Sequence, residues 1–151
     1  MGAERVAVVG VGQTKYTAVR GDVSLPGLLR EATFRALEDA QMTLADIDAI
    51  VIGKAPDFFE GIMVPEYSFV EALGAVGKPI FRVHTAGSVS GSTAIVASGL
   101  IESGVHERVL TIGWEMQSCS EAMWALSFNM PFQQQLVAGA GGYFAPYIRQ
   151  Y

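Results

Sequence analysis

The chain has 151 residues, of which 50% are hydrophobic and only 17% are charged, and its net charge is -5. This length suits one domain with a core of its own. The acidic balance and the lack of clustered Lys and Arg exclude a nucleic-acid-binding face, because phosphate groups are bound by grouped cations. A mean hydropathy of +0.32 is high for a free-standing domain, and it indicates a large buried surface, a partner chain or a missing half.

Cysteine usage and the amino terminus indicate the cellular compartment. Cys119 is the only cysteine, which excludes an intrachain disulfide, and nothing points to an oxidising compartment. The opening "MGAERVAVVGVGQTKY" has neither the length of a membrane-spanning helix nor the layout of a signal peptide. We therefore expect a cytoplasmic protein with no membrane span, and we expect no metal site.

Strand-like and helix-like segments alternate along the chain. The Val-rich "RVAVVGVG" predicts a buried first strand over residues 5–12. Ser24 and Pro26 predict the start of an amphipathic helix, because apolar residues recur at helical spacing as far as Ala40. Later strands are predicted over residues 47–53, 79–84 and 108–115, and later helices over residues 65–73, 91–103 and 143–151.

This order of elements predicts an α/β fold, with a mixed but mostly parallel sheet and outer helices. The helix over residues 91–103 differs from an ordinary covering helix, because its apolar residues point in nearly every direction. A helix of this kind is normally covered on both sides. A single sheet covers only one side of this helix. We therefore expect a central helix whose other side needs a second covering layer, and no segment of this sequence is an evident candidate for that layer.

A hydroxyl-rich loop leads into this helix. The stretch "HTAGSVSGSTAIVASGLIESG" runs from His84 to Gly104, and Ser88 lies where its small, flexible half meets its apolar half. The start of a helix presents free backbone N–H groups and the positive end of the helix dipole. Such an arrangement lowers the pKa of a nucleophile or stabilises a developing oxyanion. Ser88 is therefore the candidate around which a site would form.

The loop carries a family resemblance. The stretch "SVSGSTA", from Ser88 to Ala94, resembles the nucleophile loop of the thiolase superfamily, in which Cys-Ala-Ser/Thr-Gly-x-x-Ala opens a buried central helix. The segments "VAVVGVGQTKY", "ALEDAQMTLADIDAIVIG", "GKPIFRVHTAGS" and "FAPYIRQY" are similar to the lipid-transfer-protein branch of that superfamily. The similarity covers essentially the whole chain, and the order of its segments makes it specific.

The resemblance implies both a fold and an activity. Residues 1–151 would form the amino-terminal thiolase domain, and a second, similar half would cover the exposed side of the central helix. Members of this branch are acetyl-CoA acetyltransferases that act in degrading steroid or fatty side chains. For this chain the resemblance implies a coenzyme A thioester as substrate, no bound cofactor, and a homodimer or a complementing partner chain.

Two departures from the family pattern bear on catalysis. The nucleophilic Cys of thiolases falls at Ser88, and a serine hydroxyl needs a positioned base where a thiol does not. Thiolase-like proteins also continue into a carboxy-terminal half that supplies a catalytic His and a further Cys, whereas this chain stops at Tyr151. We therefore expect acyltransferase chemistry to be incomplete or absent in this chain alone.

Each candidate site residue has a structural alternative. Ser88 occupies the nucleophile position by resemblance, but it could equally cap the helix. His84 could orient a substrate carbonyl or act as a base, although a single His at a strand end is more often a packing residue. Gly87, Ser90 and Gly91 are the candidate substrate-binding residues beside them.

Other residues suggest chemistry more weakly. Cys119 is a thiol outside the matching motif, with no Cys/His signature around it, which argues against a nucleophile. The aromatic side chains of Trp124, Phe128 and Phe132 could line an acyl or sterol pocket. A core or a subunit interface is the more common use of such aromatics.

Two further function classes stay open. Gly10-x-Gly12 after a strand is similar to a dinucleotide-binding fingerprint, but Lys15 stands where the third glycine belongs and the helix begins more than ten residues later. The other class is a non-catalytic scaffold that binds a lipid or an acyl-CoA without turning it over. Titration with an acyl-CoA or with a nicotinamide cofactor separates these classes.

Overall fold

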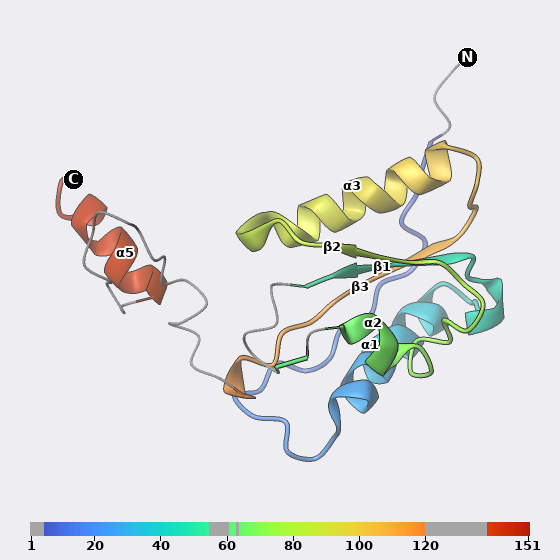
Figure 1. Ribbon diagram of the computed structural model, residues 1–151, viewed down its shortest axis with the longest axis horizontal. Helices are drawn as coiled ribbons and strands as arrows, with labels where there is room; N and C mark the ends of the chain where they lie inside the picture. Colours follow the sequence, from blue (N-terminus) through green and yellow to red (C-terminus); the bar gives the residue numbers. More distant parts are fainter. Residues whose placement is uncertain (1–4, 55–60, 63, 120–138) are drawn as a thin grey trace. The chain divides into compact units, whose positions relative to one another are not determined.

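The computed structural model describes residues 5–54, 61–62, 64–119 and 139–151 (Figure 1). The chain divides into two compact units, one formed by Met1–Ala55 with Met63–Glu115 and the other by Pro56–Ile62 with Met116–Tyr151. The assignment of residues 1–151 to a single thiolase-like domain stays a prediction.

A parallel sheet forms the centre of the first unit. Its strands are β1 (Ala49–Gly53), β2 (Ile80–Val83) and β3 (Val109–Gly113), in the order β2-β1-β3. Both neighbours pair with β1 in parallel, with Ile50 opposite Ile80 and Leu110. Every residue of β1 is buried, as a continuous apolar run in a strand with neighbours on both edges requires. The expected α/β fold with largely parallel pairing is confirmed.

Helices lie on both faces of this sheet. Helix α3 (Val89–Glu102) lies on one face, and α1 (Leu25–Asp39) and the short α2 (Pro65–Phe69) lie on the other (Figure 1). Helix α1 begins as predicted, because the Ser24 hydroxyl accepts a hydrogen bond from the Gly27 N–H at 3.3 Å. Its buried face carries Leu29, Thr33 and Leu37.

In the described part of the chain, only the side of α3 that faces the sheet is covered. Thr93 and Ala97 are buried, and α3 contacts all three strands. Ile95, on the same helix, is 74% exposed. Among the described residues the outer face of α3 is therefore apolar and open, and its cover by a second half stays a prediction.

The predicted first strand over residues 5–12 is not a strand in this structure. These residues join no ladder, and Val8, Val9 and Val11 are exposed. The segment lies instead against α1: a Cβ at Gly10 would lie 2.4 Å from the Ala36 carbonyl oxygen. The Val11 N–H also donates to Asp39 Oδ2 at 2.8 Å. The strand prediction from the valine pattern is therefore wrong for this structure, and contacts with α1 hold the segment.

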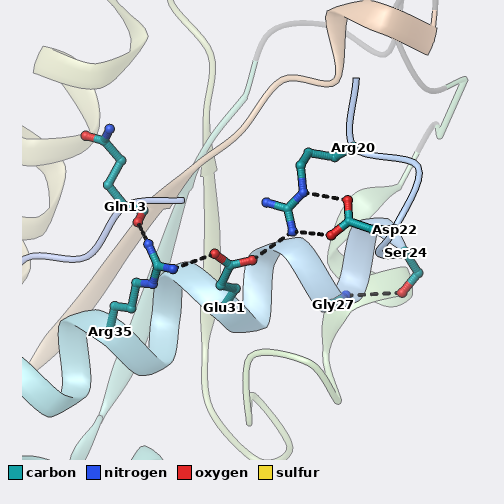
Figure 2. A network of polar contacts seen from close by, with 7 residues as sticks. All are labelled: Gln13, Arg20, Asp22, Ser24, Gly27, Glu31 and Arg35. Atoms are coloured by element: carbon teal, nitrogen blue, oxygen red, sulfur yellow. Dashed lines mark hydrogen bonds and ion pairs between the residues drawn. The ribbon is translucent and has the colours of Figure 1, made fainter. Parts of the chain in front are cut away.

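A polar network fastens the next loop to α1. Arg20 binds Asp22 at 2.8 Å and Glu31 at 3.1 Å, and Glu31 binds Arg35 at 2.8 Å (Figure 2). Arg35 also donates to the Gln13 carbonyl. Hydrogen bonds from the Arg20 guanidinium hold the pKa of Asp22 below its usual range. This network explains how a loop without regular structure is held against a helix.

The second unit contains the short 3-10 turn Gln117–Cys119 and helix α5 (Gly139–Ile148). The helix predicted over 143–151 therefore begins four residues earlier and ends earlier, with Pro146 inside it. Trp124, Phe128 and Phe132 lie outside the described residues. No helix among the described residues is long and apolar enough to cross a bilayer.

Candidate functional site

The candidate site is the turn that joins β2 to α3. A 3-10 turn, Ala86–Ser88, follows β2 and leads directly into α3. Ser88 occupies the N-cap position, but its hydroxyl accepts no hydrogen bond from the first turn of the helix. Its Oγ donates instead to the Thr85 carbonyl oxygen at 2.8 Å. The first-turn N–H groups of α3 thus receive no side-chain cap from Ser88.

A second hydroxyl contact fastens the same turn to α3. Thr85 Oγ1 donates to Ser92 Oγ at 2.8 Å, which ties the end of the strand to the first turn of the helix. His84, directly before it, is exposed. The structure therefore keeps the two predicted catalytic positions, His84 and Ser88, in one short turn.

The candidate substrate-binding residues surround the same turn. Gly87, Ser90 and Gly91 are all exposed, and a Cβ at Gly87 or Gly91 would meet open space. Because the hydroxyl of Ser88 is also exposed, a ligand could reach the turn and the start of α3 together. The roles assigned to these five residues stay predictions.

The chemistry available at Ser88 is limited by its hydrogen-bond partner. The Thr85 carbonyl oxygen accepts a hydrogen bond from the Ser88 hydroxyl, but it cannot take up the proton as a general base. The turn as described can donate hydrogen bonds to an anionic or carbonyl oxygen, which is the task of an oxyanion hole. Nucleophilic attack by Ser88 would require a general base in addition to this carbonyl.

The carboxyl end of β1 packs against the start of α3. A Cβ at Gly53 would lie 2.4 Å from Thr93 Oγ1 and 3.5 Å from Val89 Cγ2, so only glycine allows this close approach. Thr93 Oγ1 in turn donates to the Val89 carbonyl oxygen at 2.7 Å. The first turn of α3 therefore lies directly on the last residue of the central strand.

A partly buried ion pair lies next to this contact, and sequence reasoning missed it. The Lys54 side chain is 0% exposed, and its Nζ lies 3.2 Å from Glu115 Oε2. The same Nζ lies 5.7 Å from the centroid of the Trp114 ring, which packs edge-on against Phe69 at 5.2 Å. A charged residue within two residues of the end of each of two apolar strands was the available signal.

Within the part of the chain that the structure describes, two buried polar atoms near β2 and β3 have no hydrogen-bond partner. They are Trp114 Nε1 and Glu66 Oε2, although the other Glu66 oxygen binds Arg82 at 2.8 Å. Unpaired buried polar atoms are costly and uncommon in folded proteins. Glu66 belongs to α2 and binds Arg82 of β2, and Trp114 directly follows β3.

One cavity lies away from this turn. It measures about 560 Å³ and is lined by residues 5–12, by α1, by α3 and by β3. Thr33 Oγ1, which is buried without a partner, belongs to a residue that lines it. Neither Ser88 nor His84 lines this cavity. Among the described residues, no three His, Cys, Asp or Glu side chains group as metal ligands.

Comparisons with known proteins relate the chain to acyl-transferring enzymes and lipid carriers. It is 37% identical over 117 residues to sterol carrier protein 2 from Homo sapiens, a match that covers 76% of this chain and 21% of that protein. It is 34% identical over 116 residues to an acetyl-CoA acetyltransferase from Methanothermobacter thermautotrophicus, covering 73% of this chain and 29% of the relative. No protein-family model matches the chain.

The fold comparison agrees with the sequence comparison. The structure of 3-oxoacyl-[acyl-carrier-protein] synthase III from Aquifex aeolicus matches with a TM-score of 0.52 and 22% identity, over 63% of this chain and 30% of that one. The chain therefore spans less than a third of the length of each of these three proteins. At this level of identity the structural match establishes the fold.

Proposed function

This chain belongs to the thiolase superfamily, and from that premise we propose that it handles an acyl thioester of coenzyme A at the turn that begins α3. The observation that carries the proposal is the geometry of Ser88. It is exposed and stands at the amino end of α3, and its hydroxyl leaves the first-turn N–H groups without a side-chain cap. Those N–H groups suit the carbonyl oxygen of a thioester.

The finer parts of the proposal concern the substrate and the assembly. The substrate is a coenzyme A thioester of a lipid or steroid side chain, handled in the cytoplasm with no tightly bound cofactor. The reaction is of the acetyl-CoA acetyltransferase type and requires a homodimer or a complementing chain. Two features of the described residues support a requirement for further chain: the open apolar face of α3, and a Ser88 hydroxyl that is hydrogen-bonded to a backbone carbonyl and not to a basic side chain.

A second candidate function is a non-catalytic scaffold that binds a lipid or an acyl-CoA. One observation favours it: the Ser88 hydroxyl is directed at a backbone carbonyl, which holds it in place without activating it. A scaffold would bind an acyl-CoA at the same turn and release it unchanged.

Dinucleotide binding has less support in the described structure. Gly10 lies against the carboxyl end of α1, at Ala36 and Ala40, and Gly12 approaches the backbone of Ala32 and Ala36. The fingerprint needs its glycines beside the start of a helix, where the dipole binds the pyrophosphate. These glycines instead allow close packing of two backbones.

A single substitution tests the proposal. In a Cys119→Ala background, which removes the natural thiol, we expect Ser88→Cys to be acylated by an acyl-CoA. The thiolate both attacks thioesters and benefits from the positive end of α3. Intact-protein mass spectrometry would show the mass of one acyl group.

The matched control is Ser90→Cys in the same background, because Ser90 is also exposed but lies within the first turn of α3. It should be acylated more slowly by at least about tenfold, since a residue inside the helix does not face its free N–H groups. Equal labelling of the two thiols, or labelling of neither, would contradict the proposed function. Acyl-CoA binding without labelling of Ser88→Cys would favour the scaffold.

A further inference from the structure

The Lys54–Glu115 ion pair is costly for a structure that needs only a packed core. Lys54 is fully buried and the Glu115 side chain is 24% exposed, so the pair loses most of its water, at a penalty that the attraction of the two charges repays only in part. An apolar pair of similar size would often be as stable or more stable. The buried residues of β1 and β3 are apolar, and the two charges lie just beyond the ends of these strands, so stability alone gives no reason for them.

Lys54 is connected to three strands at once. Its backbone N–H donates to the Val83 carbonyl oxygen of β2 at 3.3 Å, and it follows β1 directly. Its side chain reaches Glu115, just beyond β3, although 61 residues separate the two in sequence. The pairing of β1 with β3 ends with Gly53 opposite Gly113, so the ion pair closes this end of the ladder.

The residue before Lys54 carries the start of α3. Gly53 is in close contact with Thr93 and Val89, and Val89 follows Ser88 in the chain. A shift at the end of β1 would therefore move the first turn of α3 and the turn before it. A directional charge pair limits such a shift more than apolar packing does, because it is sensitive to distance and to angle.

We propose that Lys54 and Glu115 are positioning residues for the start of α3. Their ion pair fixes the carboxyl ends of β1 and β3 together, and through Gly53 it holds the first turn of α3 where its N–H groups face position 88. The inference rests on the proposed function for the meaning of that position. Its test does not, because the reactivity of a thiol at position 88 can be measured without any acyl-CoA.

The experiment measures the pH dependence of alkylation by iodoacetamide of Ser88→Cys in the Cys119→Ala background. Helix N–H groups that face the thiol lower its pKa and increase the thiolate fraction at neutral pH. Addition of Lys54→Met should raise the midpoint of the pH profile and slow alkylation at pH 7 by about threefold or more. Thermal unfolding of each variant shows whether the fold is retained.

Two further variants separate positioning from stability. Lys54→Met with Glu115→Leu removes both members of the ion pair together, so neither charge is left facing an apolar replacement of the other, and it should fold even if the single variant does not. We expect it to show the same change in the pH profile. Lys78→Met is the matched control. The Lys78 ammonium is partly buried, and it donates to the Leu44 carbonyl oxygen on the segment that precedes the amino end of β1.

The outcomes are distinct. A changed pH profile in the double variant, with the Lys78→Met profile unchanged, supports the inference whether or not any acyl-CoA reacts. A double variant that folds and is alkylated like its parent overturns it, and so does an equal change in Lys78→Met. Failure of acylation with a changed alkylation profile would remove the proposed function and leave the positioning role.

Discussion

Individual side chains in this protein show how burial and hydrogen bonding act together. Thr33 and Thr93 are both buried threonines in helices, at 1% and 5% exposure. Thr93 Oγ1 has a partner in the Val89 carbonyl oxygen, whereas Thr33 Oγ1 has none. The same residue type therefore stabilises one helix and imposes a desolvation cost on the other.

This contrast predicts opposite effects of one substitution. Thr33→Val removes an unpaired hydroxyl and keeps the shape, so it should raise the free energy of unfolding by about 1 kcal/mol. Thr93→Val removes a satisfied hydroxyl and should lower that free energy by about 1 kcal/mol. Urea denaturation followed by circular dichroism measures both. Equal changes in the two variants would show that Thr33 Oγ1 finds a partner in solution.

At the scale of the elements, the amino ends of β1 and β3 are joined by one carboxylate. Asp48 Oδ2 accepts hydrogen bonds from the backbone N–H groups of Arg108 at 2.8 Å and Glu107 at 2.9 Å. Those bonds favour the charged form and hold the pKa of Asp48 below its usual range. The ion pair of Lys54 and Glu115 joins the same two strands at their other ends.

A depressed carboxyl pKa in the folded chain has a definite consequence for acid stability. Its contribution is fully present above the ordinary Asp pKa of about 3.9 and is lost as the pH falls through the lower folded value. Asp48→Asn, which keeps an accepting oxygen, should therefore flatten the decline in unfolding free energy below about pH 4. Denaturation at several pH values tests this. An unchanged acid decline would show that Asp48 does not contribute to it.

Sequence patterns predicted the elements of this fold better than its connections. The apolar run of β1 and the Ser24 cap of α1 are local signals, and both were confirmed. Residues 5–12 carry a strand pattern too, but their contacts are with α1 and not with a strand, which no local pattern reveals.

In the candidate site, too, the local features were predictable from sequence and the long-range contact was not. Ser88 was placed at a helix start because the change from small to apolar residues is visible in one stretch of sequence. Lys54 and Glu115 were not paired, because only the register of β1 with β3 brings together residues so far apart.

At the scale of the whole molecule, the described surface carries apolar side chains that a free-standing domain would bury. Val8 is 84% exposed on the segment beside α1, and Ile95 is 74% exposed on α3. Gathered apolar surface is usually covered by another chain or another part of the same protein. The thiolase-like proteins that this chain resembles are longer, and in such proteins further chain is available to cover these faces.

This exposure predicts association in solution. The chain alone should form oligomers or aggregates and should bind a hydrophobic dye, because water-exposed apolar faces associate. Ile95→Glu should reduce both effects, whereas Val105→Glu, at a residue that is 72% exposed outside α3, should change them little. Light scattering and dye fluorescence measure the two effects. A monodisperse monomer without dye binding would contradict the prediction.

The central place of β1 in the sheet also affects how the chain folds during synthesis. Its second neighbour, β3, ends about 60 residues later, so β1 is complete long before the sheet can close around it. At a synthesis rate of about 5–20 residues per second, this interval is roughly 3–12 s. Parallel pairings between distant segments form slowly, because a long loop must first close. During that interval the fully apolar β1 has only chaperones or another nascent chain to cover its second edge.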